Sequence, residues 1–193
     1  MTRAAKKKNQ LSAEDWIKAA FRALSAGGVQ AIRAEAIARD LGTTKGSFYW
    51  HFRDVPALKE AMLQTWSKRA TEDIIALNAG PFRDASARLQ DLIALVTSER
   101  SAEYGGVRTE AAIREWAQLD GKAASTAKNV DRRRLEYLQS IVSDIGYDSE
   151  DAARMARLLY GALIGLEYLE AQELADAASV LEALGLMIAS ARM

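Results

Sequence analysis

The residues best suited to chemistry in this chain are hydrogen-bond donors gathered in one short segment, residues 43–51. Lys45 can reach the O6 or N7 atom of a guanine, Ser47 can adapt to several partners, and Tyr49 can donate to a phosphate. Gly46 has no side chain, so the backbone at that position can approach a base pair closely. These donors suit a surface that reads DNA.

Catalytic chemistry finds little support in the remaining residues. The chain has one histidine and no cysteine, and it has neither a glycine-rich phosphate loop nor a pair of histidines at metal-binding spacing. The carboxylate pairs Glu72-Asp73 and Glu150-Asp151 are adjacent on expected helices, so their side chains diverge. We therefore expect no enzyme activity, no metal site and no cofactor.

The donor segment lies in a pattern typical of a helix-turn-helix. A helix over about 33–41 precedes Gly42, which permits a sharp turn, and Thr43 or Thr44 caps a second helix that runs to about residue 51. Two alternatives stay open: taken singly, Trp50 is more typical of a packing residue, whereas His51 is more typical of a phosphate contact than of a structural histidine.

Composition predicts an all-α protein of about nine helices. The chain contains two prolines and is rich in Ala, Leu, Glu and Arg. Ser12 and Asp15 mark the start of the first helix, and Asp54 and Pro56 mark the start of the fourth. The expected helices cover approximately residues 12–27, 33–41, 43–51, 54–78, 83–103, 107–118, 122–145, 149–170 and 173–191.

The charge distribution suggests three segments. Net charge is zero, but basic residues outnumber acidic ones in residues 1–55, and the reverse holds over 56–193. A basic N-terminal segment followed by an acidic C-terminal segment fits a polyanion-binding module joined to a second domain. We expect a disordered basic arm over 1–10, a helix-turn-helix domain over 11–55 and a helical ligand-binding and dimerisation domain over 56–193. The arm either enters the minor groove or is a solvated tail.

Residues 16–63 resemble the TetR family of bacterial transcriptional regulators. The similarity rests on Ala20, Phe21, Gly28, Ile37-Ala38, Leu41-Gly42, Lys45-Gly46, Phe48-Tyr49, His51-Phe52 and Leu58. The resemblance implies a nine-helix, homodimeric, all-α repressor with a C-terminal ligand-binding domain. It also implies a DNA-binding face made of Thr43, Thr44, Lys45, Gly46, Ser47, Tyr49, Trp50 and His51.

Two positions depart from the pattern of that family. Arg33 stands where the family often has a capping Thr or Ser, and Val55 stands where a phosphate-binding Lys is common. Either Arg53 or Lys59 compensates for the missing charge, or phosphate affinity is lower.

The last two helices carry apolar stripes that suit a dimer interface, although the stripes could instead pack within one subunit. One stripe contains Leu158, Leu159, Ala162 and Leu166, with Gly161 and Gly165 permitting close approach. The other contains Ala178, Leu181, Leu184, Gly185, Ile188 and Ala189. Large apolar side chains could line a ligand pocket or simply form the core; the candidates are Met62, Trp66, Trp116, Tyr137, Met155 and Tyr160.

Together these features predict a cytoplasmic, homodimeric transcriptional regulator that binds double-stranded DNA. We expect a repressor that a small-molecule effector releases from a pseudo-palindromic operator. The alternative is a helical protein–protein interaction module whose DNA-binding head is weak or vestigial.

Overall fold

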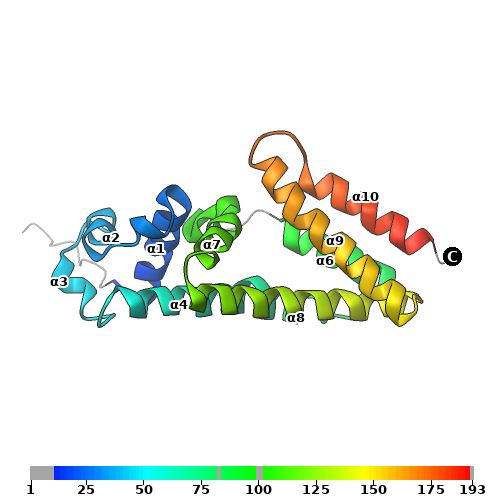
Figure 1. Cartoon of the computed structure of the whole chain (residues 1–193), viewed down its shortest axis with the longest axis horizontal. Coiled ribbons are helices and arrows are strands. Elements are labelled where there is room, and N and C mark those ends of the chain that lie inside the picture. The colour runs from blue at the N-terminus through cyan, green and yellow to red at the C-terminus, as the bar shows by residue number, and fades with distance from the viewer. Residues whose placement is uncertain (1–10, 82–83, 99–101, 192–193) are drawn as a thin grey trace, which may run out of the picture.

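A computed structural model describes residues 11–81, 84–98 and 102–191 of the chain (Figure 1). The predicted basic arm over 1–10 lies outside the described residues. Every regular element in the described part is helical, which confirms the all-α prediction. The three N-terminal helices lie at one end of an elongated molecule, and the last two helices lie toward the other. No helix among the described residues is both long enough and apolar enough to cross a membrane.

The N-terminal helices follow the predicted caps closely. Helix α1 (Ala13–Gly27) begins with a capping box in which Ser12 and Asp15 each bond the other's backbone N–H. Helix α2 (Ala34–Asp40) follows a short 3₁₀ turn, η1 (Val29–Ala31). Helix α3 (Lys45–Phe48) is capped by Thr44 and is shorter than predicted. The N–H groups of residues 49–51 bond to carbonyls three residues earlier, so the helix tightens into 3₁₀-type turns there.

The predicted helix over 54–78 is present but interrupted. Helix α4 (Val55–Ser67) is capped by Asp54 and leads into a π-helical turn, η2 (Lys68–Glu72), which continues as α5 (Asp73–Leu77). The wider π-helical turn leaves backbone carbonyls in need of other partners. The Arg134 guanidinium donates to the Ala70 carbonyl through Nη2 at 2.9 Å and Nε at 3.2 Å. The contact gives the Ala70 carbonyl a partner within the widened turn.

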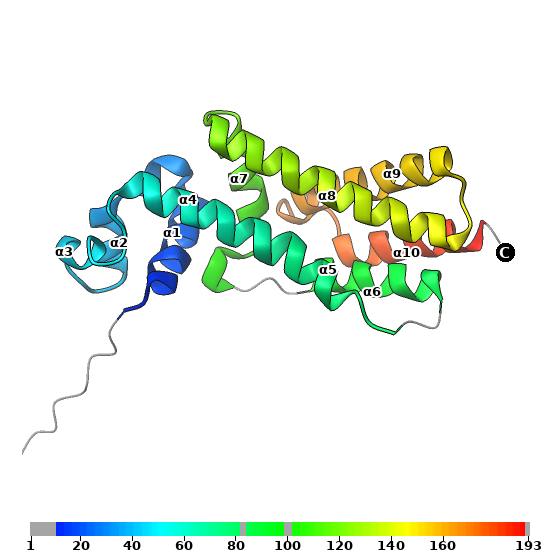
Figure 2. The ribbon, with the colours of Figure 1, turned by 90° about the horizontal axis from the view of Figure 1, so that it is seen from below.

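The C-terminal part consists of α6 (Ala85–Thr97), α7 (Thr109–Ala117), α8 (Gly121–Ile145), α9 (Ser149–Glu170) and α10 (Ala177–Ser190). Two 3₁₀ turns, η3 (Ala102–Tyr104) and η4 (Gly106–Arg108), precede α7. Figure 2 shows α4 and α5 running beside the long helix α8. When α4, η2 and α5 are taken as one rod, the described residues form the nine predicted α-helices.

Two apolar clusters hold these helices together. The first joins α1–α4 to α7 and the first half of α8, and the second joins α6, the rest of α8, α9 and α10. Apolar packing is therefore continuous across residue 55, where the sequence predicts the boundary between the two domains. Helix α1 packs directly on both α4 and α7.

The segment that leads into α7 forms side-chain hydrogen bonds with α1. Tyr104 donates its hydroxyl proton to Glu14 at 2.6 Å, and the hydroxyls of Ser25 and Thr109 are 3.1 Å apart. Between them Gly105 has a φ of 87°, and a Cβ there would lie 2.9 Å from the Phe21 carbonyl oxygen. Glycine is required at this position by both its backbone conformation and the close approach of α1.

Candidate functional sites

The short helix α3 is held by its inner face, which leaves its outer face free. Gly42 makes the turn with a φ of 63°, and the Thr43 N–H bonds the Ala38 carbonyl at 2.9 Å. Phe48 is fully buried, with its ring 5.4 Å from that of Trp16 in an edge-on contact and 5.8 Å from that of Phe52. One buried aromatic thus fixes the orientation of the whole turn-and-helix segment.

The structure brings all eight residues of the predicted DNA-binding face to this one end of the molecule. Thr44, Lys45, Gly46, Tyr49 and Trp50 are exposed, and Thr43, Ser47 and His51 are partly exposed. The packing interpretation of Trp50 is wrong, because its side chain is 88% exposed. The His51 ring lies 6.3 Å from the Trp16 ring, so one side of it rests on α1. Contact of these residues with DNA stays a prediction.

Lys45 is engaged by a residue that the sequence did not single out. Its ammonium group forms an ion pair with Glu35 in the first turn of α2. The hydrogen bond between them raises the pKa of Lys45 and lowers the pKa of Glu35. Both side chains are about half exposed, so the pair stabilises the fold little. Its importance is that a carboxylate sits beside the strongest candidate base reader.

The two departures from the family pattern have clear structural counterparts. Arg33 occupies the N-cap position of α2 and makes no side-chain cap. Val55 begins α4 and packs against the first apolar cluster. Of the two possible substitutes, Lys59 lies over the Trp116 ring, 5.8 Å from its centroid, whereas Arg53 is exposed beside Asp54. Arg53 is therefore better placed to meet a phosphate near α3.

A cavity of about 300 Å³ lies among α4, η2, α5, α6, α8, α9 and the turns before α7. Three of the predicted pocket residues, Trp66, Tyr137 and Tyr160, line it. The other three do not line it, which corrects the sequence-based set. Met62 and Trp116 are buried in the first apolar cluster, and Met155 packs against the second.

A buried group of charges forms part of the cavity wall. Glu110, only 4% exposed, accepts hydrogen bonds from Trp66 Nε1 at 3.0 Å, Arg114 Nη2 at 3.1 Å and Arg134 Nη1 at 2.8 Å. Burial acts to raise the pKa of Glu110, but the positive charge of Arg134 and these bonds outweigh it and lower the pKa to about 2. Glu110 is therefore a buried, ionised carboxylate in the folded chain.

The same charges extend to α9. The Tyr160 hydroxyl accepts from Arg134 and Arg114 and donates to Asp131 at 2.6 Å. Arg114 completes this group through two bonds to the Asp131 carboxylate, at 3.0 and 3.2 Å. This arrangement cannot be predicted from the order of residues, because its members lie on three helices that only the fold brings together.

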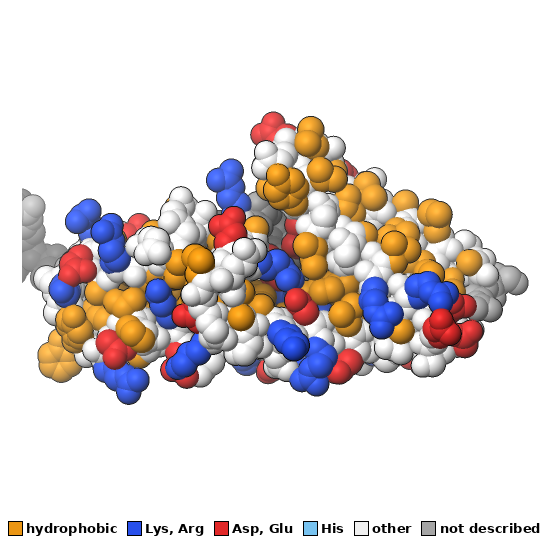
Figure 3. All heavy atoms as spheres, in the orientation of Figure 1, with side chains coloured by type: hydrophobic (Ala, Val, Ile, Leu, Met, Phe, Trp, Pro, Cys, Tyr) orange, Lys and Arg blue, Asp and Glu red, His pale blue; other side chains and the backbone are white. Residues whose placement is uncertain are grey.

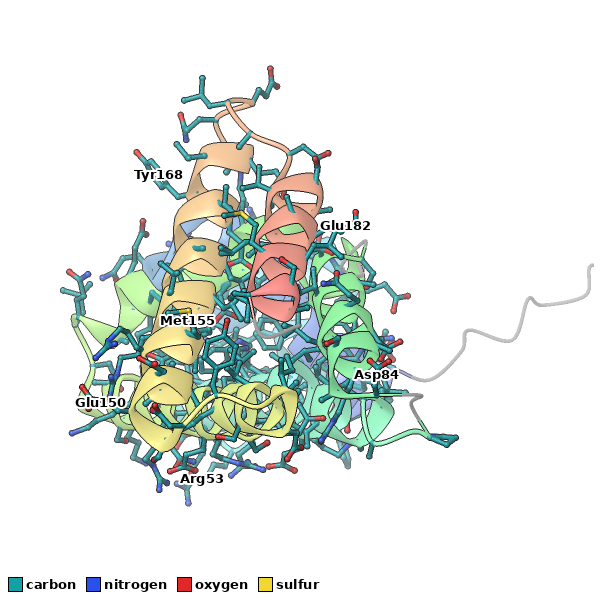
Figure 4. The ribbon with its side chains drawn as sticks, turned by 90° about the vertical axis from the view of Figure 1, so that its right-hand side faces the viewer. Arg53, Asp84, Glu150, Met155, Tyr168 and Glu182 are labelled. Carbon is teal, nitrogen blue, oxygen red and sulfur yellow. The ribbon has the colours of Figure 1, made fainter. Side chains whose placement is uncertain are left out.

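Helices α9 and α10 present an apolar face that no described residue covers. It consists of Leu158, Gly161, Gly165, Tyr168, Val180, Leu186 and Met187. Figure 3 shows hydrophobic side chains gathered over these two helices, and Figure 4 shows Tyr168 projecting from α9.

The predicted stripes on these helices are only partly correct. Gly161 and Gly165 are exposed as expected, and space for a Cβ is open at both. Leu159, Leu166, Leu181 and Ile188, however, are buried in the second apolar cluster within the subunit. Gly185 is likewise buried, against Ile93 and Gln90 of α6. The exposed apolar face of α9 and α10 is therefore rotated about the helix axes relative to the predicted stripes.

Comparison with known proteins agrees with this architecture. Residues 17–63 match the family model described as bacterial regulatory proteins, tetR family. No curated protein sequence matches the chain significantly.

Several solved structures share the whole fold. A TetR transcriptional regulator from Legionella pneumophila has a TM-score of 0.74 at 15% identity, covering 97% of both chains. A putative TetR-family regulator from Rhodococcus sp. has a TM-score of 0.73 at 20% identity, covering 92% of this chain and 98% of that one. The regulator FadR from Bacillus subtilis, solved with stearoyl-CoA, has a TM-score of 0.68 at 13% identity, covering 93% and 98%.

Proposed function

We propose that this chain is a sequence-specific transcriptional repressor that a small molecule releases from DNA, because residues 17–63 match the family model of the bacterial tetR regulatory proteins. The observation that carries the proposal is the outer surface of α3 and its two flanking ends, where Thr44, Lys45, Gly46, Tyr49 and Trp50 are exposed on a segment anchored by buried Phe48. In this proposal Lys45, Ser47 and Tyr49 read bases, and Thr43, Thr44 and His51 hold phosphates.

Two copies of the chain would be needed to recognise a pseudo-palindromic operator. Recognition helices of a dimer enter successive major grooves about 34–36 Å apart or a multiple of that distance. The uncovered apolar face of α9 and α10 is the surface on which we place the two-fold interface. Its exposed glycines would let helices of the two subunits approach closely.

The cavity supports the proposed response to a small molecule. Its walls include residues of η2 and α5, which continue the rod that begins with α4 directly after α3. A ligand that binds more tightly when this rod is displaced would favour a spacing of α3 helices that no longer matches the operator. The solved FadR complex with stearoyl-CoA shows that a protein of this fold accommodates a ligand.

Binding to the DNA upstream of the chain's own gene tests the proposal. We expect the logarithm of the association constant to fall linearly with the logarithm of salt concentration, by about 0.9 for each phosphate neutralised. Fluorescence anisotropy with a labelled duplex across a salt series measures this slope, and a duplex of shuffled sequence is the control. Equal affinity for both duplexes, or no binding to either, would contradict the proposal and favour the interaction-module alternative.

Leu186→Glu is expected to weaken the dimer at least tenfold, because it places a charge in the centre of the proposed interface. Sedimentation velocity over a concentration series measures the dissociation constant. Leu119→Glu is the matched control, since Leu119 is also exposed but lies between α7 and α8, away from this face. Equal dissociation constants for the two variants would place the interface elsewhere.

A further inference from the structure

The charged residues that line the cavity have a net positive charge. They are Arg69, Glu110 and Arg134. Glu110 and Arg134 are joined at 2.8 Å and neutralise each other, and both Glu110 oxygens already accept hydrogen bonds. A cationic ligand would find no unengaged carboxylate on this wall. The remaining charge is the positive charge of Arg69.

The phenol hydroxyls around the cavity and the hydroxyl of Thr109 are also committed to the protein. Tyr137 donates to the Asn78 side chain at 2.9 Å, Tyr160 donates to Asp131, and Tyr104 donates to Glu14. Thr109 donates to the Tyr104 carbonyl at 2.6 Å. These groups can shape a ligand site, but their protons are not available to a ligand without breaking an existing bond.

Arg69 differs from its neighbours in this respect. Its guanidinium lies over the Tyr104 ring, 4.1 Å from the centroid, and it has no carboxylate within ion-pair distance among the described residues. Arg69 and Ser98 are the exposed members of the lining, so the cavity reaches solvent beside them. Contact with the Tyr104 ring holds the guanidinium at this place, and a guanidinium can bind a carboxylate through two parallel N–H bonds.

The opposite walls of the cavity are apolar. They are formed by Ile74, Leu92, Val96, Leu138, Leu159 and Leu163 from four helices. The volume of about 300 Å³ is at the small end of the range for ligand sites. The cavity thus combines a compact apolar interior with one cation at its opening, Arg69, that forms no direct ion pair with a described carboxylate.

We propose that the effector is a compact apolar molecule with a single carboxylate, which binds Arg69 while its apolar part fills the cavity. This inference rests on the proposed ligand-responsive function and specifies the ligand class. It also gives the ligand a direct point of action. Arg69 and Ala70 are neighbours in η2, where Arg134 holds the Ala70 carbonyl, so the carboxylate is bound by the turn that joins α4 to α5.

Isothermal titration calorimetry of the full chain with matched probes tests the ligand class. The anionic probes are octanoate and 1-naphthoate, the neutral probe is octanol, and the cationic probe is octylammonium. We expect at least one anionic probe to bind at least tenfold more tightly than octanol and octylammonium. Equal or tighter binding of octylammonium, or saturable binding of neither anion, would overturn the proposal.

Two charge-removing variants then test the role of Arg69. Arg69→Gln should weaken the anionic probe at least tenfold and leave octanol unchanged. Lys68→Gln removes the same charge from the adjacent residue, which is paired with Asp73 and does not line the cavity, and should leave both probes unchanged. If Arg69→Gln has no effect, or if it weakens octanol equally, the assignment of Arg69 is wrong.

The DNA-release experiment separates this inference from the proposed function. Anisotropy with the operator duplex is repeated with a saturating concentration of the anionic probe. Arg69-dependent binding with lower DNA affinity supports both proposals. Arg69-dependent binding without any change in DNA affinity supports the ligand class and contradicts ligand-controlled release.

Discussion

Glu110→Gln is expected to reduce the free energy of unfolding by about 3–5 kcal/mol, because it leaves Arg134 in the interior without its counter-charge, whereas Arg114 keeps Asp131. Glutamine has nearly the shape of glutamate, so the change removes the charge without creating a cavity. The Arg134 side chain is only 17% exposed, and water cannot fully solvate it in place of the carboxylate. Such a loss is a large part of the total stability of an ordinary domain, about 5–15 kcal/mol.

Urea unfolding followed by circular dichroism measures this loss as a lower midpoint with an unchanged slope. Glu72→Gln is the matched control. Glu72 pairs with Arg133 at 2.9 Å, but its side chain is 49% exposed, so the same substitution should cost less than about 1 kcal/mol. Equal losses in the two variants would show that the buried charges are not specifically coupled.

The pKa of Glu110 predicts how this contribution depends on pH. Its folded-state value of about 2 lies below the ordinary value of 4.5, so the native state binds the proton less readily than the unfolded chain. The stabilisation is therefore complete above pH 4.5 and is lost as pH falls toward 2, a change of about 3 kcal/mol. The stability difference between the original chain and Glu110→Gln should shrink over that interval. Other carboxylates titrate there too, but they are common to both proteins and cancel in the difference.

Lys45→Ala is expected to weaken operator binding by about 1–3 kcal/mol and to relax the preference at one base position. The contact of Lys45 with Glu35 adds a second expectation. Glu35→Gln should tighten binding by roughly 1 kcal/mol, because it removes a repelling charge beside the DNA and frees the Lys45 ammonium from its competitor. Anisotropy on the operator and on duplexes with single base changes measures both effects.

A double-mutant cycle separates repulsion from competition. If Glu35 acts only by repelling DNA, Glu35→Gln should have the same effect with or without Lys45; if it competes for Lys45, the two changes should not be additive. Lys128→Ala removes a similar charge from the exposed face of α8 and should leave base preference intact. Unchanged affinity and base preference in Lys45→Ala would show that another part of α3 reads the bases.

The parts of the fold that were predicted correctly depend on neighbouring residues. The caps at Ser12, Thr44 and Asp54 use side chains that act within three residues, so the sequence displays them directly. The π-helical turn has no local signal in the sequence, and Arg134, which bonds its Ala70 carbonyl, lies 64 residues from it. The ion pair of Lys45 with Glu35 was missed for a related reason: it depends on the angle between two helices.

The candidate sites also divide into features that neighbouring residues determine and features that only tertiary packing determines. The donors of the proposed DNA-binding face are consecutive in sequence, and one turn brings them all to one end of the molecule. Residue type alone found Trp66, Tyr137 and Tyr160 in the cavity wall but could not separate them from the core residues Met62 and Trp116. On α9, Leu158 and Leu159 are equally apolar neighbours, and only packing decides that the first is exposed and the second buried.

The four tryptophans differ in solvent exposure, so that one of them can serve as an intrinsic fluorescence probe. Trp16, Trp66 and Trp116 are nearly or fully buried, whereas Trp50 stands in solvent at the end of the recognition segment. A small aqueous quencher such as acrylamide would reach the indole of Trp50 far more readily than the other three. The quenchable part of the tryptophan fluorescence therefore reports on the turn that follows α3, and the arrival of a partner at that surface can be followed without attaching a dye.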